Sequence, residues 1–125
     1  MNEFSNLNRP KHGEIWMCNL QNKNGSVQCG VRPVLIMSNN INNTHSTVIN
    51  VIPISSKIKR PLPIHVVLHD YHKFGLTVKS VLLVEQITTI PIEALQYLMG
   101  VIADEDVFRR IGNAMAIQFP CLRAS

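Results

Sequence analysis

Short apolar runs separated by polar turn residues make up most of this chain. The runs are about four to eight residues long, rich in β-branched side chains and bounded by glycine, proline, asparagine or serine, which is the pattern of strands. Strands are predicted at residues 15–20, 34–37, 47–54, 64–68, 80–84 and 86–90, the last two as separate strands or one bent strand, and residues 97–102 can add another. Short strands at this spacing predict a small, mainly β barrel.

One clear helix is predicted near the end of the chain. Asp104, Glu105 and Asp106 place anionic side chains where the positive end of a helix dipole lies. The apolar residues that follow recur at helical spacing and form one face, comprising Val107, Phe108, Ile111, Met115 and Phe119. Pro120 ends this helix, and residues 91–95, which begin with proline, predict a single earlier helical turn.

Three polar segments are predicted as loops. Residues 21–25 connect the first two strands, and the asparagine-rich residues 39–46 form a turn or surface loop. Residues 57–60 carry three cations in four positions and are followed by prolines, so they form an exposed basic loop. A basic loop can follow a phosphate backbone, although such a charge run, taken alone, is more often an ordinary solvated surface.

The second strand has an arginine at its start. Pro33 opens the apolar run 34–37, and Arg32 is predicted to lie just outside the buried strand. Because the proline ring disfavours the α region for the preceding residue, Arg32 is held in extended backbone geometry. A guanidinium held in this way can bind a phosphate with two parallel hydrogen bonds.

Composition and charge limit the class of protein. The 125 residues suit one domain, and 46% hydrophobic against 16% charged residues indicate a compact module rather than a disordered tail. The formal net charge of +4 gives a modest positive field that is compatible with RNA, and equally with no specific partner. Three cysteines without a Cys-x-x-Cys pair predict neither a disulfide framework nor a zinc site, which fits a reducing cytosol.

The motifs resemble those of a known family. Residues 25–36 read Gly-Ser-Val-Gln-Cys-Gly-Val-Arg-Pro-Val-Leu-Ile, which resembles the Gly-Ser-Glu-Gln-Gly-Gly-x-Arg-Pro-Val-Leu pattern of the MazF/PemK toxin endoribonucleases. Further similar segments follow in the same order, at residues 13–16, 52–58, 62–66 and 80–90 and in the final Asp-Glu-Asp helix. The resemblance therefore covers about residues 13–118.

This resemblance implies a fold and a function. It implies an SH3-like β-barrel of about six or seven strands with a C-terminal helix, of the kind found in CcdB and MazF, over residues 13–120, between a flexible leader 1–12 and a tail 121–125. The expected activity is metal-independent, sequence-specific cleavage of single-stranded mRNA without a cofactor. The expected partners are a second copy of the chain and an acidic, MazE-like antitoxin, in the cytoplasm. The alternative is a CcdB-like toxin that only binds DNA gyrase.

The resemblance assigns catalysis to Arg32 and Ser55, where the family has an arginine and a threonine at the end of the third strand. In metal-free RNA cleavage the neighbouring 2′-hydroxyl attacks phosphorus, so a fixed cation stabilises charge that develops in the transition state. Serine keeps the hydroxyl but lacks the methyl group that stiffens threonine. Proton transfer stays unassigned, because arginine is a poor acid or base. Among the histidines only His65 falls in a similar motif.

The expected RNA-binding residues come from four segments. They are Ser26, Gln28, Ser56, Lys57, Lys59, Arg60, His65 and Gln86, with His65 either contacting RNA or ordering the loop. Two positions depart from the family pattern, because Val27 replaces a glutamate and Cys29 replaces a glycine. If that glutamate orients the arginine or accepts a proton, activity here is lower or depends on another carboxylate, of which Glu85 is the nearest by motif.

Overall fold

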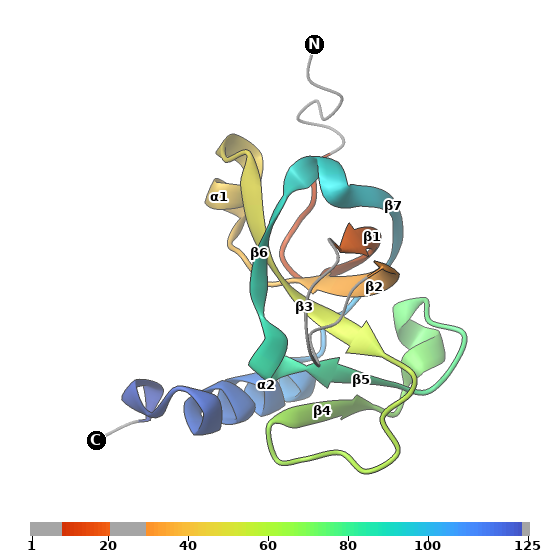
Figure 1. Ribbon diagram of the computed structural model, residues 1–125, viewed down its shortest axis with the longest axis vertical. Coiled ribbons are helices and arrows are strands. Elements are labelled where there is room, and N and C mark those ends of the chain that lie inside the picture. Colours follow the sequence, from red (N-terminus) through yellow and green to blue (C-terminus); the bar gives the residue numbers. More distant parts are fainter. Residues whose placement is uncertain (1–8, 21–29, 124–125) are drawn as a thin grey trace.

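The computed structural model describes residues 9–20 and 30–123, which form a strongly curved antiparallel sheet with a helix beneath one end (Figure 1). The strands are β1 (Glu14–Leu20), β2 (Gly30–Ile36), β3 (Val48–Ser55), β4 (His65–Leu68), β5 (Ser80–Leu83), β6 (Thr88–Pro91) and β7 (Leu95–Val101). The helices are α1 (Asn40–His45) and α2 (Glu105–Gln118), with short 3-10 turns η2 (Tyr71–Phe74), η3 (Val84–Gln86), η4 (Ile92–Ala94) and η5 (Pro120–Leu122). None of the described helices is long and apolar enough to cross a membrane.

The sheet has the order β4-β5-β3-β2-β1-β7, and β6 pairs with β3. All pairings are antiparallel, and no described pairing joins β4 to β7, so the sheet is barrel-like but open. Strand β3 changes partner along its length, from β6 up to Val51 to β5 from Ile54. Pro53 lies at this changeover, opposite Val34 of β2, and its missing N–H is tolerated where β3 passes from one partner to the other.

Two apolar cores lie on opposite faces of β2. Leu35 belongs to the core that α2 covers, with Ile111 and Ala114 of that helix. Val34 and Ile36 belong to the core inside the curl formed with β6 and β7. Burial on both faces explains why this run is continuously apolar instead of alternating.

The sequence prediction for Pro33 was wrong in one respect. Strand β2 begins at Gly30, so Pro33 lies inside the strand and does not open it. Strand β2 pairs with β3 only from Val34 onwards, and up to Pro33 its one described partner is β1. A strand with one partner tolerates proline as an edge strand does. Arg32 is therefore part of β2, opposite Cys18 of β1.

The asparagine-rich segment 39–46 is a short helix, where the sequence predicted a turn or loop. The Asn39 side chain accepts a hydrogen bond of 2.8 Å from the Asn42 N–H and caps α1. Asn43 is fully buried, and its amide group donates to the Ser38 carbonyl at 2.8 Å while its oxygen accepts from the Ser38 hydroxyl at 2.6 Å. Asparagine here caps and anchors a helix because its side chain replaces missing backbone partners.

The predicted leader and the predicted C-terminal helix differ in how far the structure agrees with them. Residues 1–8 of the predicted leader lie outside the described residues, whereas the Arg9 guanidinium donates to the carbonyls of Asn43 and Ser46, so residues 9–12 belong to the fold. The predicted C-terminal helix is confirmed as α2, with Val107 and Ile111 buried on its apolar face. Phe119 follows the helix and is 38% exposed, so the last residue of the predicted apolar face of α2 lies outside the buried core.

Candidate active site

A cleft of about 260 Å³, here called the first cleft, opens beside the middle of β2. Strands β1, β2 and β7, the end of β3 and the segment 76–80 contribute its walls. The lining residues are Met17, Val31, Arg32, Pro33, Ile54, Ser56, Leu76, Thr77, Val78, Ser80 and Met99. Among these described residues Arg32 is the only charged one, so the cleft combines apolar walls, three hydroxyl groups and a single cation.

Arg32 is half-buried in the first cleft, and the residues before and after it in the chain restrict its backbone. It lies between Gly30, whose positive φ of 79° starts the strand, and Pro33, and it is paired across the ladder with Cys18. The proline and the β1 ladder keep the backbone extended, as the sequence predicted. The guanidinium thus enters the cleft from a fixed strand rather than from a loop, which favours a preorganised anion site.

The two serines at the end of β3 have different surroundings. Ser56 lines the first cleft with Arg32 and is exposed. Ser55 is 2% exposed, is not among the residues that line the cleft, and its hydroxyl oxygen accepts a hydrogen bond of 3.2 Å from the Lys57 N–H. The structure therefore brings Ser56, rather than the expected Ser55, into the cleft that holds Arg32.

The segment 76–78 forms a wall of the first cleft that sequence reasoning missed. It is held against β7 by a contact between two glycines, because a Cβ atom on Gly75 would lie 2.2 Å from the Met99 carbonyl oxygen and one on Gly100 would lie 2.1 Å from that of Phe74. Gly75 also has a φ of +85°, which glycine adopts readily. Thr77 enters the cleft only through this long-range contact, and no local motif marks it.

His65 orders the basic loop that connects β3 to β4. The ring Nδ1 of His65 accepts a hydrogen bond of 2.9 Å from the Leu62 backbone N–H. The backbone N–H of His65 donates to the Leu62 carbonyl at 2.8 Å. Because Nδ1 is an acceptor, the neutral ring carries its proton on Nε2, which lies 3.2 Å from Glu85 Oε2. Both ring nitrogens are used within the fold, which corresponds to the loop-ordering alternative for His65.

The remaining predicted RNA-binding residues are dispersed. Lys57, Lys59 and Arg60 are all exposed on the basic loop, and of these Lys59 lines a second cleft together with Ser56. Gln86 ends η3, next to Glu85, and lines neither cleft. The predicted contacts Ser26 and Gln28, and the departures Val27 and Cys29, lie outside the described residues.

No histidine or carboxylate lines the first cleft within the described part of the chain. His12 lies 3.1 Å from the Met37 carbonyl through Nδ1, and its ring is 4.9 Å from that of Phe108. Residues 9–20 and 30–123 also contain no group of three or more His, Cys, Asp or Glu side chains that could hold a metal ion. The described polar groups of the cleft are thus one guanidinium and the hydroxyls of Ser56, Thr77 and Ser80.

Burial changes the chemistry of the thiol opposite Arg32. Cys18 is fully buried, and this desolvation raises the pKa of its thiol from 9.0 to about 11. The thiol therefore stays protonated at neutral pH, so it does not neutralise the guanidinium across the strand pair.

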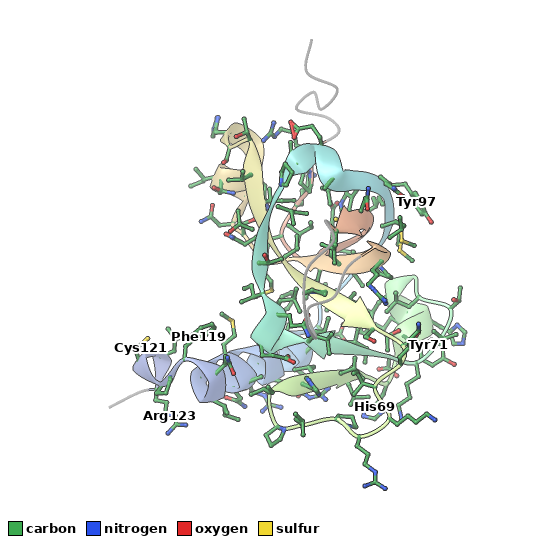
Figure 2. All side chains as sticks on the ribbon, in the orientation of Figure 1. His69, Tyr71, Tyr97, Phe119, Cys121 and Arg123 are labelled. Carbon is green, nitrogen blue, oxygen red and sulfur yellow. The ribbon has the colours of Figure 1, made fainter. Side chains whose placement is uncertain are left out.

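A labelling experiment tests the state of this thiol. At pH 8, iodoacetamide is expected to modify Cys121, which is exposed beyond α2 (Figure 2), and to leave Cys18 unmodified. The reason is that a thiolate is the nucleophile and Cys18 forms almost none at that pH, besides being inaccessible. Peptide mass spectrometry measures both sites, and both should react in urea. Equal native rates would show that β1 and β2 separate readily.

The fold and the first cleft define a class before any relative is considered. A small open barrel with an arginine on a strand beside a cleft, next to an exposed basic loop, has a charge distribution that suits an anionic ligand. Comparison with protein families gives a match over residues 11–119 to the PemK-like, MazF-like toxin of type II toxin-antitoxin systems. This chain belongs to that family.

Individual relatives agree with the family match. The endoribonuclease EndoA of Bacillus subtilis is 35% identical over 108 residues, which cover 86% of this chain and 91% of EndoA. The endoribonuclease MazF of Staphylococcus saprophyticus is 32% identical, with 86% and 88% covered. A mycobacterial endoribonuclease solved in complex with its cognate antitoxin has the same fold, with a TM-score of 0.67, 22% identity and coverage of 89% and 95%. The predicted family and barrel-like fold are confirmed.

Proposed function

We propose that this chain is the toxin of a type II toxin–antitoxin pair and cleaves single-stranded RNA as a metal-independent, sequence-specific endoribonuclease. The observation that carries the proposal is the first cleft, which both Arg32 and Ser56 line in a chain of this family. The two curated relatives, each matched over 86% of this chain, are endoribonucleases. Arg32 is the one predicted catalytic residue that lines the cleft.

The reaction that suits these groups is transfer within the RNA backbone. The 2′-oxygen attacks the adjacent phosphorus and loses its proton, the bond from phosphorus to the 5′-oxygen breaks, and that oxygen takes up a proton. The products are a 5′-hydroxyl and a 2′,3′-cyclic phosphate, which water can open to a 3′-phosphate. Arg32 binds the phosphoryl oxygens as negative charge grows on them, and the Ser56 hydroxyl donates a further hydrogen bond to the same group.

The partners proposed for this chain are an acidic antitoxin and a second copy of itself, in the cytoplasm. The basic net charge of +4 and the exposed basic loop suit an acidic partner. The two strands that flank β1 in the sheet, β2 and β7, carry large apolar side chains that are more than half exposed, namely Val31, Tyr97, Leu98 and Val101, and a homodimer would bury them. Sedimentation at the assay concentration measures the oligomeric state, and a monomer at that concentration would exclude the proposed homodimer.

A cleavage assay tests the proposed function. Purified protein is incubated with a long single-stranded RNA in EDTA, and the fragment ends are mapped. Discrete cuts that leave 5′-hydroxyl ends are expected. If folded wild-type protein produces no cuts with or without added Mg²⁺, the nuclease proposal fails, and a gyrase inhibition assay then tests the binding-only alternative.

Paired serine variants decide which hydroxyl acts with Arg32. Ser56→Ala is expected to lower kcat by about 100-fold, the lower end of the loss found when one transition-state hydrogen-bond donor is removed. Ser55→Ala removes the acceptor of the Lys57 N–H, and it should act mainly on stability, by about 1 kcal/mol. Single-turnover kinetics and urea unfolding separate the two effects. A larger loss of kcat in Ser55→Ala would return the catalytic role to Ser55.

A further inference from the structure

A second cleft, of about 240 Å³, adjoins the first and shares Ser56 with it. It lies between the basic loop and the face of β4 and β5. Its lining residues are Ser56, Ile58, Lys59, Pro61, Val67, His69, Lys79 and Val81. Because one residue belongs to both clefts, a single extended ligand can occupy both without crossing the core.

The pairing of β4 with β5 places apolar and cationic positions in order along the second cleft. Val67 lies opposite Val81, and the last ladder pair is Leu68 with Ser80. Alternation along each strand puts His69 two positions after Val67 and Lys79 two positions before Val81, on the same face as the valines. Figure 2 shows His69 where β4 ends, and both His69 and Lys79 line the cleft. The strand register therefore places His69 and Lys79 next to Val67 and Val81.

The charge of the second cleft has no counterion among the described residues. No carboxylate lines it, and neither Lys59 nor Lys79 takes part in a described ion pair. Two surface cations outside the cleft are paired, since Lys73 lies 3.2 Å from Asp104 and Arg109 contacts Asp106. Two unpaired lysines in one cleft favour an anion, and a phosphate suits the point charge of lysine.

The second cleft also has an apolar wall, to which the loop and the strands both contribute. Ile58 and Pro61 of the loop line the cleft together with Val67 and Val81. Sites for drug-sized ligands measure about 300 to 1,000 Å³, so a cleft of about 240 Å³ suits a smaller unit. A nucleotide has both required parts, a phosphate for the lysines and a flat base for the apolar wall. A peptide of acidic residues alone, such as poly-glutamate, would supply charge but no flat or apolar group for that wall.

We propose that the second cleft holds one RNA nucleotide adjacent to the scissile phosphate, with Lys59 and Lys79 bound to the phosphate of that nucleotide. This inference rests on the proposed function, because it places the scissile phosphate beside Arg32. Through this site the protein would contact RNA outside the cleaved phosphodiester bond. The site includes Lys79 and His69, which lie in none of the expected RNA-binding segments. Removing one lysine should weaken binding of substrate and transition state alike, which raises KM and leaves kcat unchanged.

The test uses an RNA oligonucleotide that carries the mapped cleavage sequence with a 2′-deoxy sugar at the cleaved nucleotide. This change removes the nucleophile, so binding can be measured by fluorescence anisotropy over a range of salt concentrations. Lys79→Ala and Lys59→Ala should each reduce the slope of log K against log salt by about 0.7, the value for one phosphate contact on a single strand. Lys73→Ala, which removes the same charge outside both clefts, should leave the slope unchanged.

A second set of oligonucleotides locates the contact. Each flanking phosphate is replaced in turn by a neutral methylphosphonate, and Kd is measured with wild type and with Lys79→Ala. One substitution next to the cleavage site should weaken binding to wild type and have no further effect on Lys79→Ala, because the two changes remove the same contact. Strictly additive losses at every position would overturn the proposal.

The remaining outcomes separate this site from the proposed function. If wild type cleaves RNA but Lys79→Ala and Lys59→Ala keep the wild-type salt slope and KM, only the second cleft is excluded from RNA binding. If these variants lose affinity for a poly-glutamate peptide instead, the cleft belongs to an acidic protein partner and the proposal is overturned. If wild type neither cleaves nor binds RNA, the proposed function fails and this inference with it.

Discussion

Replacing Arg32 by alanine is expected to lower kcat for RNA cleavage by about 100- to 1,000-fold, the loss found when a preorganised transition-state donor is removed. Arg32 is the only charged side chain among the described residues of the first cleft, and it stands on a strand whose backbone is fixed by Pro33 and by β1. No neighbouring cation of that cleft can replace it. Single-turnover cleavage with saturating enzyme measures the effect on chemistry alone.

Arg32→Lys is the matched control for this variant. Lysine keeps the positive charge but lacks the planar fork that binds two phosphoryl oxygens at once, so its activity should fall between those of wild type and Arg32→Ala. Thermal unfolding of all three proteins shows whether the fold is retained. Wild-type kcat in a folded Arg32→Ala protein would exclude the arginine from catalysis.

Replacing Gly100 by alanine is expected to destabilise the protein by about 3 kcal/mol or more, at the upper end of the range for overpacked sites. The added Cβ would lie 2.1 Å from the Phe74 carbonyl oxygen, 2.7 Å from its carbonyl carbon and 3.1 Å from the Gly75 Cα. All three are backbone atoms, so relief requires a shift of η2 or β7 rather than a rotamer change. Urea unfolding measures the loss.

Gly112→Ala provides the matched control, since it makes the same chemical change in an open position. A Cβ on Gly112 meets no atom within 4 Å, and the residue lies on the exposed side of α2. The substitution should stabilise the protein by about 1 kcal/mol, because alanine has the higher helix propensity. If Gly100→Ala is as stable as wild type, the contact between the two glycines is looser than the structure indicates.

The strands and the last helix could be predicted from the sequence because their patterns are local. Alternation and short apolar runs located every strand to within a few residues, and the spacing of Val107 and Ile111 located α2. The Asn39 cap was missed because composition alone does not distinguish an asparagine-rich turn from a capped helix. Pro33 was misplaced because its tolerance inside β2 depends on where pairing with β3 begins.

The candidate site was predictable only where a motif marked it. Arg32 was found in this way and lines the cleft, but the choice between Ser55 and Ser56 depends on which side chain faces inward at the end of β3. Thr77 and Lys79 could not be found from the sequence. Their positions follow from the contact between Gly75 and Gly100 and from the register of β4 on β5.

The pairing of the first strand with the last has a consequence for synthesis of the chain on the ribosome. Glu14 pairs with Val101, and the first cleft takes residues from Met17 to Met99, so its walls come from almost the whole sequence. Contacts between such distant residues form late in folding. At about 5 to 20 residues per second, translation therefore continues for several seconds before a nascent chain can complete the cleft, and a partial chain released early carries no assembled site.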